Sequence, residues 1–345
     1  MSRSSNIALP ETRRTARVAS RIVAQINRAG IFIVLLAMLA AFTWVQPVFA
    51  KPNNLLDILQ AVSVTALLAQ GITISLAVGG FDLSVGSTAA LGVMTSAYAQ
   101  VVWQWGAVPT VLLVLAVGVA VGLLNTLLIL WLRVPDLLAT LGTSFLVGGL
   151  QLIPSAGNSL SSGMMLSDGS TAPGHFAAAF LWIGRARIGN HVPLPVLLLA
   201  VVAIALWVLM ERTRWGRVMY AVGGNPLAAH LAGAPTARLR MAAYVLSGML
   251  ASLGGILLAA RVGRGDVMTG ASLLQDAFAA ALIGFAVWNL RRPNILGTVV
   301  GAVFVGVLLN GLTMLDVPYY MQDFIKGMVL VASLALTYRF GGKRR

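Results

Sequence analysis

The residue whose chemistry first needs an explanation is Asp82, which lies in the stretch LAVGGFDLSVGSTAALG at residues 76–92. It is the single carboxylate of that stretch, and most of its neighbours are apolar or small. One interpretation is a helix cap, in which Asp82 accepts hydrogen bonds from the free N–H groups that open a helix at residues 83–85. The other is a non-helical segment that lines a polar path, because irregular backbone within a membrane needs protein or water around it. Both interpretations stay open.

Few other residues could carry out catalysis or hold a cofactor. The chain has no cysteine, which excludes disulfides and thiolate metal sites, and its histidines are too scattered for a zinc motif: His175, His191 and His230. It has no G-x-x-x-x-G-K-[ST] loop for ATP phosphates. An ion-coupled transporter would need a carboxylate in an apolar context, and only Asp82 and Asp276 qualify. We therefore expect neither an enzyme nor a metal or cofactor site in this chain.

The composition indicates a membrane protein. Hydrophobic residues make up 58% of the 345 residues, charged residues make up 10%, and the mean hydropathy is +0.87. A net charge of +14 would suggest nucleic acid in a soluble chain. Here the basic residues form short clusters between long apolar runs, as they do in the loops of membrane proteins. We therefore expect membrane lipid as the surrounding medium and no nucleic acid as a partner.

The elements that must position these residues are membrane-spanning helices, each of about 20 apolar residues. Counting along the chain, we predict an all-α polytopic protein with ten such helices at residues 31–49, 55–78, 83–103, 109–132, 137–154, 192–210, 241–260, 273–288, 295–315 and 322–338. If the N-terminus is cytoplasmic, most of the 24 Lys and Arg residues then fall on the inner side. The prediction is a transmembrane region at 31–338, between a basic cytoplasmic segment at 1–30 and a basic cytoplasmic tail at 339–345.

The first apolar run could also be a signal peptide, since a basic region precedes it and Val48-Phe49-Ala50 would serve as a cleavage site. The run is long enough to span a membrane, so we expect an uncleaved first helix. Two long connections remain. The one at residues 155–191 is expected to face the periplasm, and the one at 211–240 the cytoplasm.

The connection at 211–240 contains the pattern of a short helix. Asn225 is a good N-cap, Pro226 suits the first helical turn, and Gly233 is placed to end the helix. A helix this short is marginal alone in water, so it must be held by packing. One possibility is that it rests on the membrane interface, with the surrounding arginines near anionic lipid headgroups.

Four ordered motifs resemble a known family. GGFDLSVGSTAALG resembles the G-G-x-D-L-S-V-G-S signature of permease subunits in the ribose-transport branch of ABC importers. VPDLLATLGTSFLVGGL at 134–150, AVGGNPLAAHLAGAP at 221–235 and GTVVGAVFVGVLLNGLTML at 297–315 are similar to further segments of that family. Together they cover most of residues 55–338.

The resemblance implies a fold, a function and partners. The fold would be two four-helix halves, helices 2–5 and 7–10, related as an inverted repeat. The function would be import of a monosaccharide or similar neutral polyol across the inner membrane by alternating access. The partners would be a second permease subunit (as a homodimer or heterodimer), a periplasmic substrate-binding protein, and two cytoplasmic ATPase domains that bind ATP and Mg.

The resemblance also suggests two groups of functional residues. For the substrate path or gate we assign Phe81, Asp82, Ser84, Ser87, Thr140, Thr143 and Asn310. For a coupling helix seated in a groove of the ATPase subunit we assign Asn225, Pro226, Ala228, Ala229, His230 and Gly233.

One segment departs from the family pattern. In GFAVWNLRRPNILG at 284–297, Arg291 and Arg292 replace small residues of a Gly-rich segment. We expect them to be positive-inside anchors, and the alternative is a contact with an ATPase subunit. The departure leaves the substrate open. A permease of the same superfamily for branched-chain amino acids or a furanone-type signal is an alternative, and an ion-coupled secondary transporter is a further one.

Overall fold

The computed structural model describes residues 30–165, 169–189, 191–287 and 292–341. Within these ranges the chain is almost entirely helical. The one sheet among the described residues is a small antiparallel hairpin of β1 (Arg187–Ile188) and β2 (Val192–Pro193). The predicted basic segment at 1–30 lies outside the described residues except for Gly30. Of the predicted basic tail at 339–345, residues 339–341 belong to the last helix and 342–345 lie outside the described residues.

Each of the ten predicted apolar stretches contains a helix. The first is Gly30–Val45, and the others are α2 (Pro52–Ala77), α3 (Val85–Ala97), α4 (Ala107–Thr126), α5 (Asp136–Leu150), α7 (Leu194–Trp207), α10 (Thr236–Val262), α11 (Thr269–Val287), α12 (Ile295–Met314) and α13 (Tyr319–Gly341). Three of them continue as a π-helical turn: α3 at Tyr98–Val102, α4 at Leu127–Trp131 and α7 at Val208–Arg212. Three shorter helices lie in the long connections: α6 (Ala178–Arg185), α8 (Arg214–Gly224) and α9 (Pro226–Leu231).

Six described helices are long and apolar enough to cross a membrane: Pro52–Ala77, Ala107–Trp131, Asp136–Ser155, Leu194–Arg212, Thr236–Val262 and Ile295–Met314. Gly30–Val45 and Thr269–Phe285 are apolar but shorter. The protein is thus a polytopic membrane protein. The connection predicted at 211–240 is shorter than expected, because α10 already begins at Thr236.

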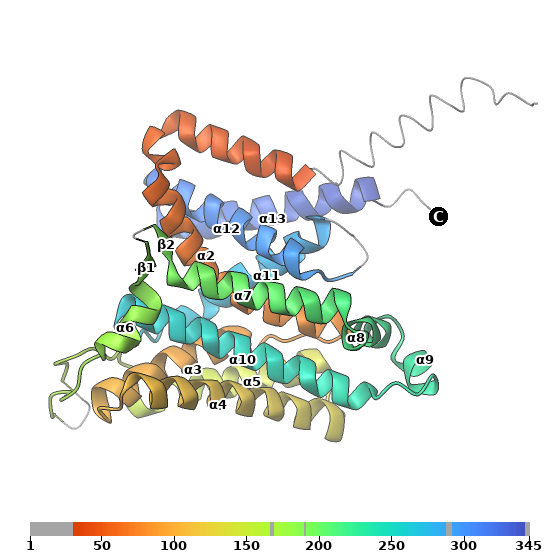
Figure 1. The fold of residues 1–345 in the computed structure, drawn as a ribbon, viewed down its shortest axis with the longest axis horizontal. Helices are drawn as coiled ribbons and strands as arrows, with labels where there is room; N and C mark the ends of the chain where they lie inside the picture. Colours follow the sequence, from red (N-terminus) through yellow and green to blue (C-terminus); the bar gives the residue numbers. More distant parts are fainter. Residues whose placement is uncertain (1–29, 166–168, 190, 288–291, 342–345) are drawn as a thin grey trace, which may run out of the picture.

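Helices α2, α10 and α12 form the centre of the molecule. In these three, 61–67% of the apolar span is buried, whereas in α4, α5 and α7 the figure is 28%. Figure 1 shows α6 and the β1–β2 hairpin at one end of the helices, and α8 and α9 at the opposite end. The second end contains the site described below.

Glycines set the distance between α4 and α10. A Cβ added at Gly118 would lie 2.4 Å from the carbonyl oxygen of Gly248, and one added at Gly248 would lie 2.2 Å from that of Gly118. Neither position admits a larger residue unless the helices separate, because small residues are what lets membrane helices approach this closely. The close approach places Ser247, next to Gly248, within reach of residues of the α2–α3 connection.

Candidate functional site

The site is built around the connection between α2 and α3, residues 78–84, which we call the 78–84 segment. Helix α2 ends at Ala77, and Gly79 has a φ of +78°, a left-handed conformation that favours glycine. The chain then runs without helical structure to Ser84, and α3 begins at Val85. Two carboxylates, Asp82 and Asp136, hold this segment from different sides.

Asp82 is 1% exposed and accepts hydrogen bonds from three donors of its own chain. Its Oδ1 accepts from the backbone N–H of Ser84 (3.0 Å) and from the Ser84 hydroxyl (2.6 Å), and its Oδ2 accepts from the hydroxyl of Ser247 in α10 (2.7 Å). The amide of Asn125 in α4 donates to the Ser84 hydroxyl at 2.8 Å. Asp82 thus connects the start of α3 to α4 and α10.

One of the three expected capping hydrogen bonds to Asp82 is present. Of the N–H groups at residues 83–85, only that of Ser84 donates to Asp82. The N–H of Leu83 donates instead to the hydroxyl of Thr140 in α5, at 3.2 Å. Asp82 therefore combines a local capping contact with a contact between helices that are distant in the sequence.

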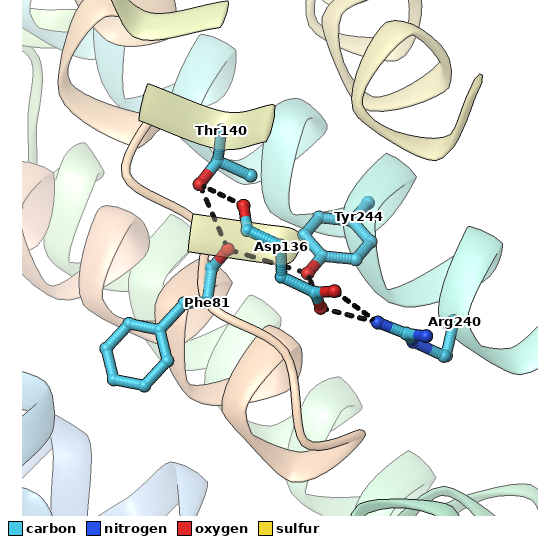
Figure 2. Close-up of polar contacts among 5 residues, drawn as sticks. All are labelled: Phe81, Asp136, Thr140, Arg240 and Tyr244. Atoms are coloured by element: carbon cyan, nitrogen blue, oxygen red, sulfur yellow. Dashed lines mark hydrogen bonds and ion pairs between the residues drawn. The ribbon is translucent and has the colours of Figure 1, made fainter. Parts of the chain in front are cut away.

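Asp136 lies in the first turn of α5 and holds the other side of the segment. Its carboxylate accepts hydrogen bonds from Arg240 in α10 at 2.5 and 2.6 Å and from the hydroxyl of Tyr244 at 2.5 Å. The Tyr244 hydroxyl also lies 3.5 Å from the carbonyl oxygen of Phe81, and the Thr140 hydroxyl lies 3.1 Å from the same oxygen. Figure 2 shows these groups converging on Phe81 from α5 and α10.

Helix geometry explains why these residues meet. Arg240 and Tyr244 are four residues apart and so lie on one face of α10. Asp136 and Thr140 have the same spacing on α5. A carboxylate at a helix N-terminus is favoured by the helix dipole, and one withdrawn from water needs a charged or hydrogen-bonding partner. Gly80 leaves room for them, since a Cβ there would lie 2.3 Å from the Tyr244 hydroxyl.

The structure brings most of the assigned path residues together. Ser87 and Thr143 are buried close to this site on α3 and α5, and the Ser87 hydroxyl donates to the carbonyl of Ser84. Phe81 is 41% exposed, and its ring stacks on Phe278 of α11 with centroids 6.1 Å apart.

Asn310 lies apart from the other path residues. It is on α12, where its side-chain oxygen accepts a hydrogen bond from Asn54, a residue at the start of α2. Asp82 follows the other end of this 26-residue helix.

The predicted short helix is present as α9. The side chain of Asn225 accepts from the N–H of Ala228 at 2.9 Å, Pro226 is the first helical residue, and Gly233 follows with a φ of +84°. Asn225, Ala228, His230 and Gly233 are exposed. Ala229 is 8% exposed and faces its own chain.

Arg292 contacts its own chain. It forms an ion pair with Glu211 at 3.0 Å, and its guanidinium lies 4.9 Å from the centroid of the Tyr220 ring. The Tyr220 hydroxyl donates to the carbonyl oxygen of Pro293 at 2.9 Å. Arg292 thus takes part in a defined contact with α8, beyond the anchoring expected of it. Arg291 lies outside the described residues.

Asp276, the second acid in an apolar context, is also paired. It contacts Lys326 of α13 at 2.6 Å, and Lys326 lies 2.9 Å from Asp323. Within the described ranges, no three His, Cys, Asp or Glu side chains are grouped as a metal site would require.

Five residues of the site were not predicted from the sequence: Asn125, Asp136, Ser247, Arg240 and Tyr244. The four-residue spacings on α5 and α10 were a signal for Asp136, Arg240 and Tyr244. Nothing in the local sequence connects Ser247 or Asn125 with Asp82, because the contacts depend on how the helices pack.

Comparison with known proteins places the chain in a family. Residues 54–334 match the family described as "Branched-chain amino acid transport system / permease component". The chain is 34% identical over 304 residues to the ribose import permease protein RbsC of Escherichia coli K12, covering 88% of this chain and 91% of that protein. It is 32% identical over 325 residues to the galactose/methyl galactoside import permease protein MglC of the same organism (90% and 94% covered).

A third relative is the D-allose transport system permease protein AlsC of Escherichia coli K12, which is 30% identical over 311 residues (90% of this chain and 91% of that protein). No solved structure matches the chain. The match spans nearly all of the helical region, and with it the 78–84 segment and α9. The chain therefore belongs to this family of transport-system permease components, and it is a membrane transporter subunit rather than an enzyme.

Proposed function

We propose that the protein imports a neutral sugar or polyol, as the permease of an ATP-driven importer in the inner membrane. The observation that carries the proposal is its similarity, over about nine tenths of its length, to permeases for ribose, galactose and allose. Charge supports it as well. Asp82, Asp136 and Asp276 each have partners in their own chain, and a charged cargo would call for a compensating charge on its path.

The transport path in this proposal passes the 78–84 segment and the neighbouring faces of α3 and α5. Phe81 supports the assignment because its ring is partly exposed beside the buried polar residues. Among the described residues the buried Thr143 hydroxyl has no hydrogen-bond partner, as expected of a group that could accept from or donate to a passing hydroxyl. The position of Asn310 does not support its assignment to the path, because it lies near the start of α2 and the other path residues lie near the end of that helix.

The decisive test is reconstitution in proteoliposomes with the cognate ATPase and binding protein. We expect ATP-dependent uptake of a labelled sugar among ribose, galactose and allose, and no uptake of leucine. Leucine uptake would favour a second candidate function, that of a branched-chain amino acid permease. Branched-chain amino acids are the substrates named for the matching family. Uptake driven by an ion gradient without the ATPase would overturn both in favour of a secondary transporter.

The proposed architecture has ten spanning helices, both termini in the cytoplasm and two inverted four-helix repeats. The chain has no native cysteine, so single cysteines can report sidedness. Ser162→Cys, in the long connection before α6, is expected to react with an impermeant thiol reagent only from outside. Leu231→Cys, on α9, is expected to react only from inside. The same side for both would exclude this topology.

Coupling to ATP hydrolysis is assigned to α9. Leu227 and Leu231 are one turn apart on it and are 68% and 78% exposed, and two leucines left in water suggest a partner groove. We expect Leu227→Ala and Leu231→Ala to weaken co-purification of the ATPase subunit. Ile188→Ala, which truncates an exposed residue at the opposite end, serves as the control. Unchanged co-purification together with weaker binding to anionic vesicles would favour the membrane-interface interpretation.

A further inference from the structure

Helix α8 lies directly before α9, with only the cap residue Asn225 between them. One face of α8 is buried, at Gly216, Met219 and Val222. Because only one residue separates the two helices, a displacement of α9 also displaces α8. The residues that α8 touches decide where such a displacement goes.

The first contact of α8 is with the end of α2. A Cβ added at Gly223 would lie 2.3 Å from the carbonyl oxygen of Ala77 and 3.0 Å from the backbone nitrogen of Gly79. The two backbones are thus in direct contact, with no side chain between them. Since close-packed interiors have low compressibility, backbone contact of this kind transmits displacement. Beyond it lie the 78–84 segment and Asp82.

The second contact of α8 is with the residues that precede α12. The Tyr220 hydroxyl lies 2.9 Å from the carbonyl oxygen of Pro293 and 3.2 Å from Oε1 of Glu211, its two hydrogen-bond acceptors, and Arg292 lies over its ring. Burial, and after it the Glu211 carboxylate, raises the pKa of Tyr220, so the hydroxyl stays protonated and remains a donor at neutral pH. Asn294, next in the chain, caps α12 by accepting from the N–H of Gly297 at 3.0 Å. This contact therefore leads to the start of α12.

The geometry points to α8 as a two-point connector, which transmits the movement of α9 to the 78–84 segment through Gly223 and to the start of α12 through Tyr220. The inference rests on the proposed function, because α9 moves only if an ATPase subunit binds it. It adds a role for α8, and it makes Gly223 and Tyr220 positioning residues. A single helix would then drive both four-helix halves of the proposed architecture in one step.

The first test compares Gly223→Ala with Gly224→Ala. Both substitutions remove a glycine from the same helix and raise helix propensity by a similar amount. A Cβ at Gly224 meets nothing within 4 Å, so it is a matched control. We expect Gly223→Ala to co-purify with the ATPase subunit but to lose the stimulation of ATP hydrolysis by loaded binding protein. Gly224→Ala is expected to keep both.

The second test compares Tyr220→Phe with Tyr98→Phe, which avoids any clash that could prevent folding. Each substitution removes a hydroxyl that donates to a proline carbonyl, that of Pro293 in one case and that of Pro154, at the opposite end, in the other. We expect Tyr220→Phe to lower the amount of sugar imported per ATP about fivefold, the equivalent of ~1 kcal/mol for one hydrogen bond. Tyr98→Phe should leave this ratio unchanged.

The outcomes separate the inference from the function on which it rests. Suppose that the wild-type complex imports sugar, that Gly223→Ala keeps the stimulation of ATP hydrolysis by loaded binding protein, and that Tyr220→Phe keeps the amount of sugar imported per ATP. Then α8 is not the connector, although the permease function stands. If the wild-type complex imports no sugar in the presence of ATP, the proposed function itself is wrong. Loss of coupling in Gly223→Ala or Tyr220→Phe, with both controls intact, supports the connector.

Discussion

Asp82 and Asp136 hold the same 78–84 segment in two different ways. Asp82 is 1% exposed, and its partners are neutral: two serine hydroxyls and a backbone N–H. The side chain of Asp136 is 20% exposed, and it pairs with the charged Arg240 as well as the neutral Tyr244. One carboxylate is stabilised by the arrangement of neutral dipoles, and the other by an opposite charge.

The difference shows what each site can tolerate. Buried polar groups must find partners, but hydroxyl groups can rotate to donate or accept. The Asp82 network can therefore adjust to a neutral residue of the same shape. A guanidinium can only donate and keeps its charge, so Arg240 requires an anion beside it. Asp136 should therefore be the more sensitive of the two to loss of charge, and Asp82 the more sensitive to loss of polarity.

The largest effect is expected for Asp82→Leu. The substitution keeps the branching and the number of side-chain heavy atoms but leaves the Ser84 and Ser247 donors without an acceptor in a buried region, which costs about 1–3 kcal/mol for each. We expect a markedly lower yield of assembled protein and a clearly lower unfolding temperature in detergent. Ile188→Ala, which truncates an exposed residue at the opposite end of the molecule, is the control for handling. Wild-type yield and uptake would show that Asp82 has no structural role.

A smaller loss is expected for Asp136→Asn, which removes the charge but keeps the shape. Arg240 then has no counter-ion, and because the pair is partly exposed we expect a loss of about 1–2 kcal/mol, less than for a fully buried pair. Thermal unfolding in detergent measures it. The double variant Asp136→Asn with Arg240→Gln should recover part of the stability. Equal stability of the single and double variants would argue against a charge pair.

Tyr244→Phe tests the neutral partner of Asp136. It removes one hydroxyl and leaves the buried ring in place, so we expect a loss of ~1 kcal/mol in unfolding free energy, the typical contribution of one hydrogen bond. The carboxylate retains Arg240. A loss as large as that of Asp136→Asn would mean that the hydroxyl, and not the charge, is the main partner.

The smallest effect is expected for Asp82→Asn. The amide oxygen can accept from Ser84, while the Ser247 hydroxyl can turn to accept from the amide nitrogen. We therefore expect an unfolding temperature close to that of the wild type, and sugar uptake reports separately whether the charge has a role in the gate. A destabilisation larger than that of Asp136→Asn would reverse the comparison.

Much of the fold could be predicted from local sequence. Ten long apolar runs correspond to ten helices, because an apolar helix needs only its own residues and a lipid environment. Helix α9 was predicted from Asn225, Pro226 and Gly233, whose capping and turn preferences act within a few residues. The position of Asp82 just before a helix was predicted for the same reason.

The contacts that make the site could not be predicted in this way. Ser247 is 165 residues from Asp82 in the sequence, and Arg240 is 104 residues from Asp136. Whether such residues meet depends on the rotation and distance of α5 and α10 relative to α2 and α3. The glycines at positions 118 and 248 help to set that distance, and the sequence alone does not show which glycines face each other.

The sequence by itself therefore determined the long helices, the cap of α9 and the family. The tertiary structure decided which carboxylate is held by neutral groups and which by a charge, and that Gly223 touches the end of α2. The physical reason is the distance along the chain over which each kind of interaction acts. Capping, helix propensity and hydrophobic length act within a few turns of one chain segment, whereas hydrogen bonds between helices exist only after the whole bundle has packed.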